Sequence, residues 1–292
     1  MPDKHPNDTI RLMLERGSVR NFEDRPIPPE IMYRVLEAGT HAATGGNLQP
    51  YSIIQFEDQE AKQKVADLCG GQQFIAQAPV NLLFCIDLHR LDRWAALQVA
   101  PFTAAQSFRH FWVSFQDTII CAQSVCTAAD AMGLGSCYVA SILECFPELI
   151  TMFELPKGVF PVVLVSLGYP KMPPKIARKL GPEVVVHHEK YRDSENTELL
   201  ASFETKYPAY RLEANAERLA EIEKVCGEVH GAEFAELCLA RIREQGFISM
   251  IQRYYGLHYS ANYMPLGNDK FIRILEEQGL KPFKVFELTR RQ

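Results

Sequence analysis

The sequence predicts an α+β fold, in which helices and strands mix without a regular strand–helix–strand alternation. One apolar run, VNLLFCI from Val80 to Ile86, is typical of a strand buried on both faces. A longer stretch from about Gln116 to Met132 is apolar nearly all round, which indicates a helix buried in the protein or at a subunit contact. The composition of the 292 residues, 47% hydrophobic and 23% charged, is that of a globular chain with a sizeable core.

Turn-forming residues divide the first part of the chain. We expect a short helix from Thr9 to Arg16 that ends at Gly17, a residue suited to a helix C-terminus. After the proline-rich loop EDRPIPPE, Pro29 opens a second helix that runs to about Ala42, and Gly45-Gly46 breaks it. The segment from Tyr51 to Phe56 is rich in β-forming residues and is predicted to be a strand.

Two more predicted strands follow, and after them the amino-acid composition changes. The glycine turn at 133–135 stops the apolar helix, and Ser136 to Ile142 and Val159 to Leu167 are predicted strands. Beyond about Tyr191 the sequence is acidic and alanine-rich, with apolar residues at the three- and four-residue spacing of helices. We therefore expect a domain over residues 1–190 and a helical extension over 191–292. No Gly/Ser linker separates them, which favours packing of the extension on the core over the alternative, an independent helical domain.

Charge and hydropathy disfavour several classes of protein. The net charge of −5 gives no general attraction to nucleic acid or anionic lipid, so neither is an expected partner. No apolar segment approaches the roughly 18 residues of a membrane span, and the N-terminal residues lack signal-peptide features. We expect a cytoplasmic protein. The eight cysteines mostly lie in apolar runs without a C-x-x-C pair, which predicts buried, reduced thiols and no metal site.

The first motif suited to a ligand is the group Arg16, Ser18 and Arg20, in a loop just after the first helix. The planar fork of arginine can hold two phosphate oxygens, and a hydroxyl adds a further donor. Surface arginines near a helix end are common, so this motif alone is weak evidence.

The second motif is the stretch from Thr44 to Tyr51, between a helix and a strand. Its glycines permit close approach of the backbone to a ligand, and Asn47 and Gln49 each offer a donor and an acceptor. The alternative is a turn whose side chains bond only to its own backbone.

The third motif is the glycine turn that feeds the strand ending near Ala140 and Ser141, whose edge could face a flat ring. By itself it marks only the end of a helix and the start of a strand. No G-x-G-x-x-G sequence is present, so a dinucleotide fingerprint is not supported.

In this order the motifs resemble the nitroreductase family of flavoproteins. The family's phosphate-binding start is matched by RGSVRNFEDRPIPPEI, and its serine-rich NxQPW loop by ATGGNLQPYSII. Its interface helix and following turn are matched by DTIICAQSVCTAADAMGLGSCYV, and its last shared strand and basic tail by VSLGYPKMPPKIARKLGPEVV. The resemblance covers about Thr9 to His188. It implies a three-layer fold, with a central, mostly antiparallel sheet flanked by helices.

The resemblance also implies FMN as the cofactor of a homodimer with flavin sites at the subunit interface. Arg16, Ser18 and Arg20 would hold the FMN phosphate and the polar edge of the flavin. Lys175 or Arg178, in the basic tail, would close the phosphate site.

Contacts to the flavin ring are implied at two further places. Thr44 and Asn47 would reach the flavin bound mainly by the other subunit, with Gln49 close by. Backbone at Ala140 and Ser141 would face the reactive flavin nitrogen. The family often has serine at the position of Thr44 and glycines at 140 and 141, so the β-carbons here could crowd the ring or alter its contacts.

The implied activity is electron transfer from NADH or NADPH, through the flavin, to a small-molecule acceptor such as a nitroaromatic or a quinone. Donor and acceptor would use the same place in turn, which gives ping-pong kinetics without an obligatory side-chain acid or base, so no catalytic residue is assigned. The aromatic segment from Arg90 to Phe115 is the favoured pocket wall or lid, with core or dimer contacts as the alternative. Two other functions stay open: another reaction on the same fold, as in dimethylbenzimidazole synthase or reductive dehalogenases, and non-catalytic flavin binding.

Overall fold

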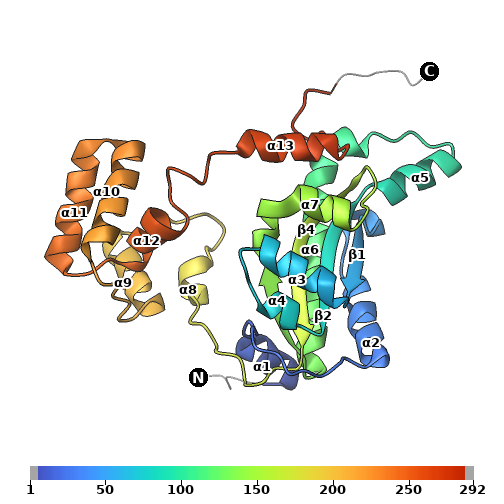
Figure 1. The fold of residues 1–292 in the computed structure, drawn as a ribbon, viewed down its shortest axis with the longest axis horizontal. Coiled ribbons are helices and arrows are strands. Elements are labelled where there is room, and N and C mark those ends of the chain that lie inside the picture. Colours follow the sequence, from blue (N-terminus) through green and yellow to red (C-terminus); the bar gives the residue numbers. More distant parts are fainter. Residues whose placement is uncertain (1–5, 287–292) are drawn as a thin grey trace. The chain divides into compact units, whose positions relative to one another are not determined.

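The computed structural model describes residues 6–286. This part of the chain forms two compact units, one of residues 6–176 with 272–286 and the other of residues 177–271. The first unit holds a β-sheet and the second holds helices (Figure 1). The predicted division into a domain over residues 1–190 and a helical extension over 191–292 packed on it stays a prediction.

A four-stranded sheet forms the centre of the first unit. Its strands are β1 (Tyr51–Phe56), β2 (Val80–Asp87), β3 (Gly135–Val139) and β4 (Val159–Gly168), in the order β1-β2-β4-β3. Every neighbouring pair is antiparallel. All residues of β2 are buried, as its continuous apolar run predicted. The predicted α+β fold with an antiparallel sheet is confirmed.

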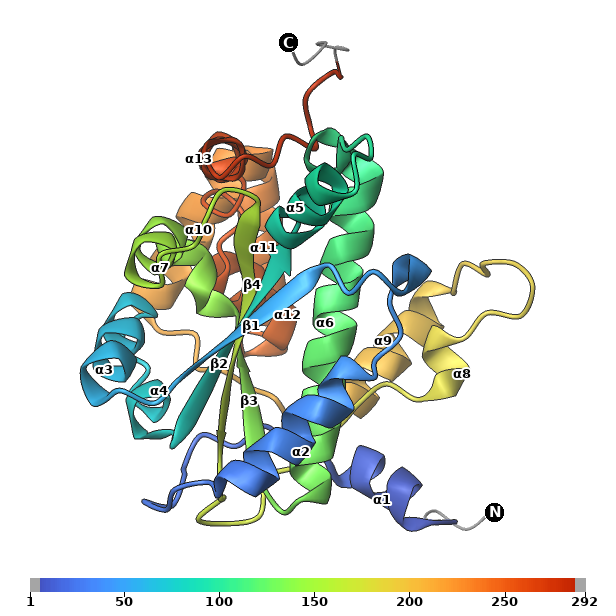
Figure 2. The same ribbon diagram turned by 90° about the vertical axis from the view of Figure 1, so that its right-hand side faces the viewer.

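Helices cover both faces of this sheet (Figure 2). On one face lie α2 (Pro29–Thr40) and α6 (Phe108–Ala131); on the other lie α3 (Gln59–Leu68), α4 (Phe74–Gln77) and α7 (Phe146–Met152). Val35 of α2 and Val125 of α6 share one core cluster with Phe84 of β2. A β-carbon at Gly39 would lie 2.3 Å from Val125 Cγ2, so glycine is what allows α2 to approach α6 this closely. The three expected layers are present.

The structure corrects two element boundaries. The apolar helix begins at Phe108 and not near Gln116, because Ser107 caps it: the Ser107 hydroxyl accepts a hydrogen bond from His110 N at 3.3 Å. The strand expected to reach Ile142 ends at Val139, where its pairing with β4 ends, and the chain turns into the 3-10 helix η3 (Ala140–Cys145).

The role expected of Gly17 was also wrong. Helix α1 (Asp8–Glu15) ends before it, and Gly17 is not among the glycines with positive φ that end helices. A β-carbon there would instead lie 2.8 Å from Pro174 Cβ and 2.9 Å from Lys175 O. Glycine is needed at this position because two chain segments meet there.

The last described residues return to the first unit, following α13 (Asn268–Glu277). Gln278 O accepts from Gly158 N at 2.7 Å, and Gln278 Nε2 donates to the carbonyls of Leu155 and Pro156 at 3.0 and 2.8 Å. Leu280 is fully buried. These contacts attach the end of the chain to the segment that leads into β4.

The remaining elements are short helices in the first unit and longer ones in the second. The first unit also has η1 (Gly45–Asn47), α5 (His89–Leu97) and η2 (Ala104–Gln106). The second has α8 (Pro182–Val185), α9 (Asn196–Lys206), α10 (Ala216–His230), α11 (Ala232–Gln245), α12 (Met250–Arg253) and the π-helix η4 (Tyr254–His258). The buried core of the second unit is formed by Ile222, Ile242 and Ile248. Among residues 6–286, no helix is long and apolar enough to cross a membrane.

The buried end of the chain gives a stability prediction. Leu280→Ala should lower the free energy of unfolding by about 2–5 kcal/mol, because it empties a fully buried site. Leu266→Ala is the matched control, since Leu266 is 66% exposed, and it should change stability by less than about 0.5 kcal/mol. Urea unfolding measures both. Equal losses of unfolding free energy in the two variants would show that burial of Leu280 does not stabilise the fold.

Candidate functional site

The segment that follows α1 lies along β3. Ser18 forms a parallel bridge with Ser136, and Val19 N donates to Ser136 O at 2.9 Å. A β-carbon at Gly135 would lie 2.4 Å from Val19 Cγ2, so the segment presses directly on the start of the strand. Because residues alternate in direction along an extended chain, Val19 points inward while Ser18 and Arg20 stay exposed.

Arg16 bonds to the same strand, but one of its nitrogens makes no hydrogen bond to the residues that the structure describes. Its Nη2 donates to Ser136 Oγ at 3.3 Å, and its Nε lies 3.9 Å from an Asp130 carboxylate oxygen. Burial raises the pKa of Asp130 to about 6, and the charge of Arg16 opposes that rise. The Nε of Arg16 is buried and makes no hydrogen bond within the described chain. The Arg16 side chain as a whole is 25% exposed, so its guanidinium can still meet an anion.

Arg20 places a second positive charge near the first. Its guanidinium lies over the Phe74 ring, 5.8 Å from the centroid. Burial raises the pKa of Cys137 on β3, and the charges of Arg20 and Arg16 both counter that rise, so both arginines flank one position of the strand. No carboxylate of the described residues forms an ion pair with Arg20. Two arginines and the Ser18 hydroxyl therefore stand together, as the first motif predicted.

The loop from Thr44 to Gln49 is fixed by a buried carboxylate. Asp117 of α6 is 4% exposed, and its two oxygens accept from Gly45 N at 3.1 and 3.0 Å. Burial raises the Asp117 pKa, and the Gly45 N–H lowers it. Asn47 and Gln49 have φ of 56° and 48°, in the left-handed region that costs most residues about 1–3 kcal/mol.

Arg90 holds the far end of the same loop. Its Nη2 donates to Gln49 O at 2.6 Å and to Tyr51 O at 2.8 Å, and its ring contact is with Trp94. The Gln49 Nε2 donates to Thr40 O at 3.0 Å and to the Tyr51 hydroxyl at 3.3 Å, so this amide nitrogen is already hydrogen-bonded. This leaves Asn47, which is exposed and makes no side-chain hydrogen bond among the described residues, to meet a ligand.

Ala140 and Ser141 lie where β3 passes into η3, with Ala140 exposed and Ser141 half-buried. The Ser141 hydroxyl accepts from Gln72 Nε2 at 2.6 Å, and the same amide donates to Cys69 O at 2.8 Å. Gln72 is a site residue that sequence reasoning missed. Its sequence could have indicated this, because Gln72 directly follows Gly70-Gly71, just as Asn47 directly follows Gly45-Gly46.

The two basic-tail candidates fall in different units. Lys175 belongs to the first, and its backbone carbonyl packs against Gly17 beside Arg16. Arg178 belongs to the second unit, so its expected role at the phosphate stays a prediction. Of the expected phosphate ligands, Arg16, Ser18, Arg20 and the backbone of Lys175 are brought together in one chain.

The flavin-ring loop is not brought to this group within the chain. It is tethered to Asp117, whereas Arg16 lies beside Asp130, and both carboxylates are on α6. Their 13-residue separation corresponds to roughly 20 Å along the helix axis. The two sets of candidate ligands are thus parts of different sites in one subunit.

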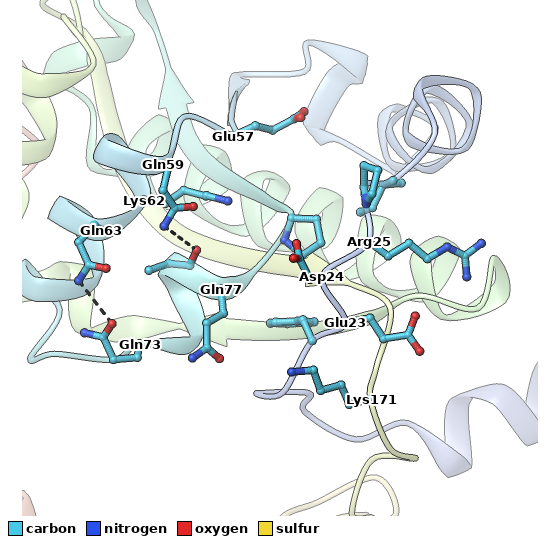
Figure 3. A pocket seen from close by; sticks show the side chains of 15 residues that line it. Glu23, Asp24, Arg25, Glu57, Gln59, Lys62, Gln63, Gln73, Gln77 and Lys171 are labelled. Atoms are coloured by element: carbon cyan, nitrogen blue, oxygen red, sulfur yellow. Dashed lines mark hydrogen bonds between the residues drawn. The ribbon is translucent and has the colours of Figure 1, made fainter.

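A cavity of about 540 Å³ lies apart from both sets, between the loop Phe22 to Ile27 and helices α3 and α4 (Figure 3). Lys62 points into it from α3 and donates to Ala78 O at 3.0 Å, with Asp24 on the opposite side. In the described chain, none of the expected flavin ligands lines this cavity. No group of three His, Cys, Asp or Glu side chains there could hold a metal.

Comparison with known proteins identifies the kind of enzyme that this fold and site define. The model of the nitroreductase family matches residues 13–169, more than half of the chain. The chain belongs to the nitroreductase family and is an oxidoreductase of that kind.

Its relatives include flavin and nitro reductases. The chain is 32% identical over 186 residues to an FMN reductase [NAD(P)H] of Bacillus subtilis, covering 63% of this chain and 75% of that one. It is 29% identical over 204 residues to an oxygen-insensitive NADPH nitroreductase of Salmonella typhimurium, covering 70% and 82%. Among solved structures, NfrA2 of B. megaterium has a TM-score of 0.72 at 25% identity and covers 95% of this chain and 100% of its own.

The Asp130 carboxyl gives a pH prediction. Burial raises the pKa of Asp130 to about 6, well above the ordinary value of an aspartate, so the folded protein holds this proton more tightly than the unfolded chain. The group therefore favours folding at low pH, and that contribution is lost as the pH rises from about 4 to 6. Relative to wild type, Asp130→Asn should gain about 2 kcal/mol in unfolding free energy between pH 4 and pH 7.5. A difference in unfolding free energy between variant and wild type that stays constant from about pH 4 to about pH 7.5 would contradict this prediction.

Proposed function

We propose that the protein is an FMN-dependent oxidoreductase that passes electrons from NADH or NADPH to nitroaromatic, quinone or similar acceptors by a ping-pong mechanism. When bound, FMN supplies the two-electron chemistry, and the protein binds it, orients it and excludes competing reactions. The observation that carries the proposal is the pair of arginines beside β3, of which Arg16 donates to Ser136 and Arg20 forms no ion pair in the described chain.

The phosphate fits this pair. Arg16 is held in one orientation by Ser136 and Asp130 before a ligand arrives. Arg20 and the Ser18 hydroxyl are exposed on the same segment, and the absence of a β-carbon at Gly17 lets the Lys175 backbone close in. This arrangement favours a compact dianion, and FMN has one phosphate of that charge at neutral pH.

The polar edge of a flavin fits the two loops. Asn47 offers a free amide on a loop fixed at both ends by Asp117 and Arg90. Ala140 ends a strand whose following hydroxyl, that of Ser141, is turned to Gln72. Rigid presentation of such groups reduces the ordering that a bound ring would require.

We also propose a homodimer in which each flavin is shared. Asp117 and Asp130, which lie against the two ligand sets, are roughly 20 Å apart along the axis of α6, and this favours a second copy that supplies the loop to the first copy's phosphate site. Large apolar side chains are exposed on the elements nearby: Met13 and Leu14 of α1, Tyr33 of α2 and Ile120 of α6. A two-fold partner would cover them, because one patch serves both subunits.

The acceptor surface that we favour is an aromatic row at the start of α6. Phe108, Trp112 and Phe115 stack in succession, with centroids 5.8 and 6.5 Å apart and interplanar angles of 24° and 26°. All three are exposed in the single chain, so they are not core residues there. Flat apolar faces suit planar acceptors and a nicotinamide ring.

Replacement of Arg20 tests the cofactor site. Arg20→Ala should weaken FMN binding roughly ten- to a hundredfold, because a charge-assisted contact to phosphate is worth about 1.5–3 kcal/mol. Arg25→Ala is the control, since Arg25 lies over Tyr169 and outside the site. Titration of the apoprotein with FMN measures both. A wild-type protein that takes up no FMN would refute the proposed function. An unchanged FMN affinity in Arg20→Ala would show that the phosphate binds at another place.

Light scattering of the flavin-loaded protein at micromolar concentration tests the assembly. We expect a mass twice that of the 33.1 kDa chain. Ile120→Lys should produce monomers that lose FMN, since it puts a charge into the apolar contact. A monomer that retains flavin would contradict a shared site.

A further inference from the structure

The last described segment of the chain brings an aromatic ring to the start of α6. The centroid of the Phe283 ring lies 5.9 Å from that of Phe108 and 5.9 Å from that of Phe111, with interplanar angles of 52° and 68°. Phe283 and Phe108 are 53% and 51% exposed, so both rings keep surface that another molecule can contact. The end of the chain thus touches the aromatic row of Phe108, Trp112 and Phe115, the acceptor surface that we favour.

A hydrogen-bonded turn holds Phe283 in this place. Lys284 N donates to Lys281 O at 3.4 Å, which closes a turn with the buried Pro282 at its second position, where proline presets the backbone angle φ. Lys281 N donates to Ala105 O of η2 at 2.7 Å. The turn is therefore tied to the segment that leads into α6.

Both sides of the turn are attached to the first unit. Leu280, just before it, is fully buried. After Phe283, the Lys284 Nζ forms an ion pair with a Glu276 carboxylate oxygen of α13 at 2.8 Å. The ring of Phe283 is thus in position before a ligand arrives, and a bound ligand need not order it.

Phe283 stands at an angle to the aromatic row. Phe108, Trp112 and Phe115 stack at interplanar angles of 24° and 26°, whereas Phe283 is tilted from Phe108 by 52°. It therefore forms a wall at the Phe108 end of the row and does not extend the row. A flat ring that lies on the row meets Phe283 at its side, and tilted or edge-to-face contacts of this kind are favoured between aromatic groups.

We propose that Phe283 is a specificity-determining residue of the acceptor site, where its ring favours planar aromatic and quinoid acceptors over acceptors without a flat face. This proposal rests on the proposed function, because it assigns a residue to the acceptor site of that enzyme. The sheet core does not include Phe283, and its ring packs on side chains at the start of α6. Loss of the ring should therefore change the binding of a flat acceptor and leave the fold intact.

Steady-state kinetics with two acceptors test the proposal, using the full-length protein with FMN and saturating NADH or NADPH. Phe283→Ala should raise the KM for 2-methyl-1,4-naphthoquinone about three- to tenfold and change kcat by less than about twofold, as expected for the loss of one aromatic contact. The KM and kcat for ferricyanide should not change, because this octahedral anion has no flat face to stack. An unchanged KM for the naphthoquinone, or an equal rise in the KM for ferricyanide, would overturn the proposal.

Two further variants separate the ring from the segment that carries it. Phe283→Tyr keeps the ring and should retain the wild-type KM for the naphthoquinone. Val285→Ala is the matched control, since Val285 is 91% exposed on the same segment, and it should behave as wild type with both acceptors. A rise in KM in Val285→Ala as large as that in Phe283→Ala would overturn a specific role of the ring.

A binding measurement distinguishes failure of this proposal from failure of the proposed function. A wild-type protein that reduces neither acceptor would refute the proposed function. Calorimetric titration of the naphthoquinone into wild type and Phe283→Ala needs no turnover and should show the same three- to tenfold weakening, about the range expected for one aromatic contact. Equal dissociation constants would overturn the role of Phe283, with or without enzyme activity.

Discussion

Two carboxylates on α6, the buried Asp117 and the part-buried Asp130, lie against the two candidate ligand loops. Asp117 accepts from Gly45 N and Asp130 lies beside Arg16, and burial raises the pKa of both acids. A carboxylate out of water is costly unless donors satisfy it, so each acid strongly favours the one loop conformation that supplies its donor. Since both acids stand on one helix, the distance between the loops is as rigid as the helix itself.

The proposed shared site follows from this geometry. In the proposed site, the phosphate ligand set lies at one end of α6 and the ring-contacting loop near its middle, which favours their serving different flavins. A second α6, related by a two-fold axis, would place the complementary set within reach. The apolar residues of α6 lie on more than one side of the helix, and the proposed partner would cover those that the first unit does not. Cys121 and Val125 face the sheet, while Ile120 is exposed.

Local patterns in the sequence predicted the local features well. The run at β2 and the apolar period of α6 predicted a buried strand and a central helix, and the order of short motifs predicted where the ligand loops would lie. The partners that fix those loops could not be predicted, because they are distant in sequence: 72 residues separate Gly45 from Asp117, and 120 separate Arg16 from Ser136. Gly17 shows the same limit. Its glycine is explained by the chain near Pro174, and not by the helix that precedes it.

The departures from the family pattern also have a structural explanation. The hydroxyls of Thr44 and Ser141 are both used inside the protein, the first accepting from Gln49 N at 3.3 Å and the second from Gln72. Thr44 is thereby turned toward its own loop, and Ser141 toward the segment between α3 and α4. What remains free is the amide of Asn47 and the exposed end of β3 at Ala140. The larger residues at these positions thus add side-chain hydrogen bonds that hold the two turns in place.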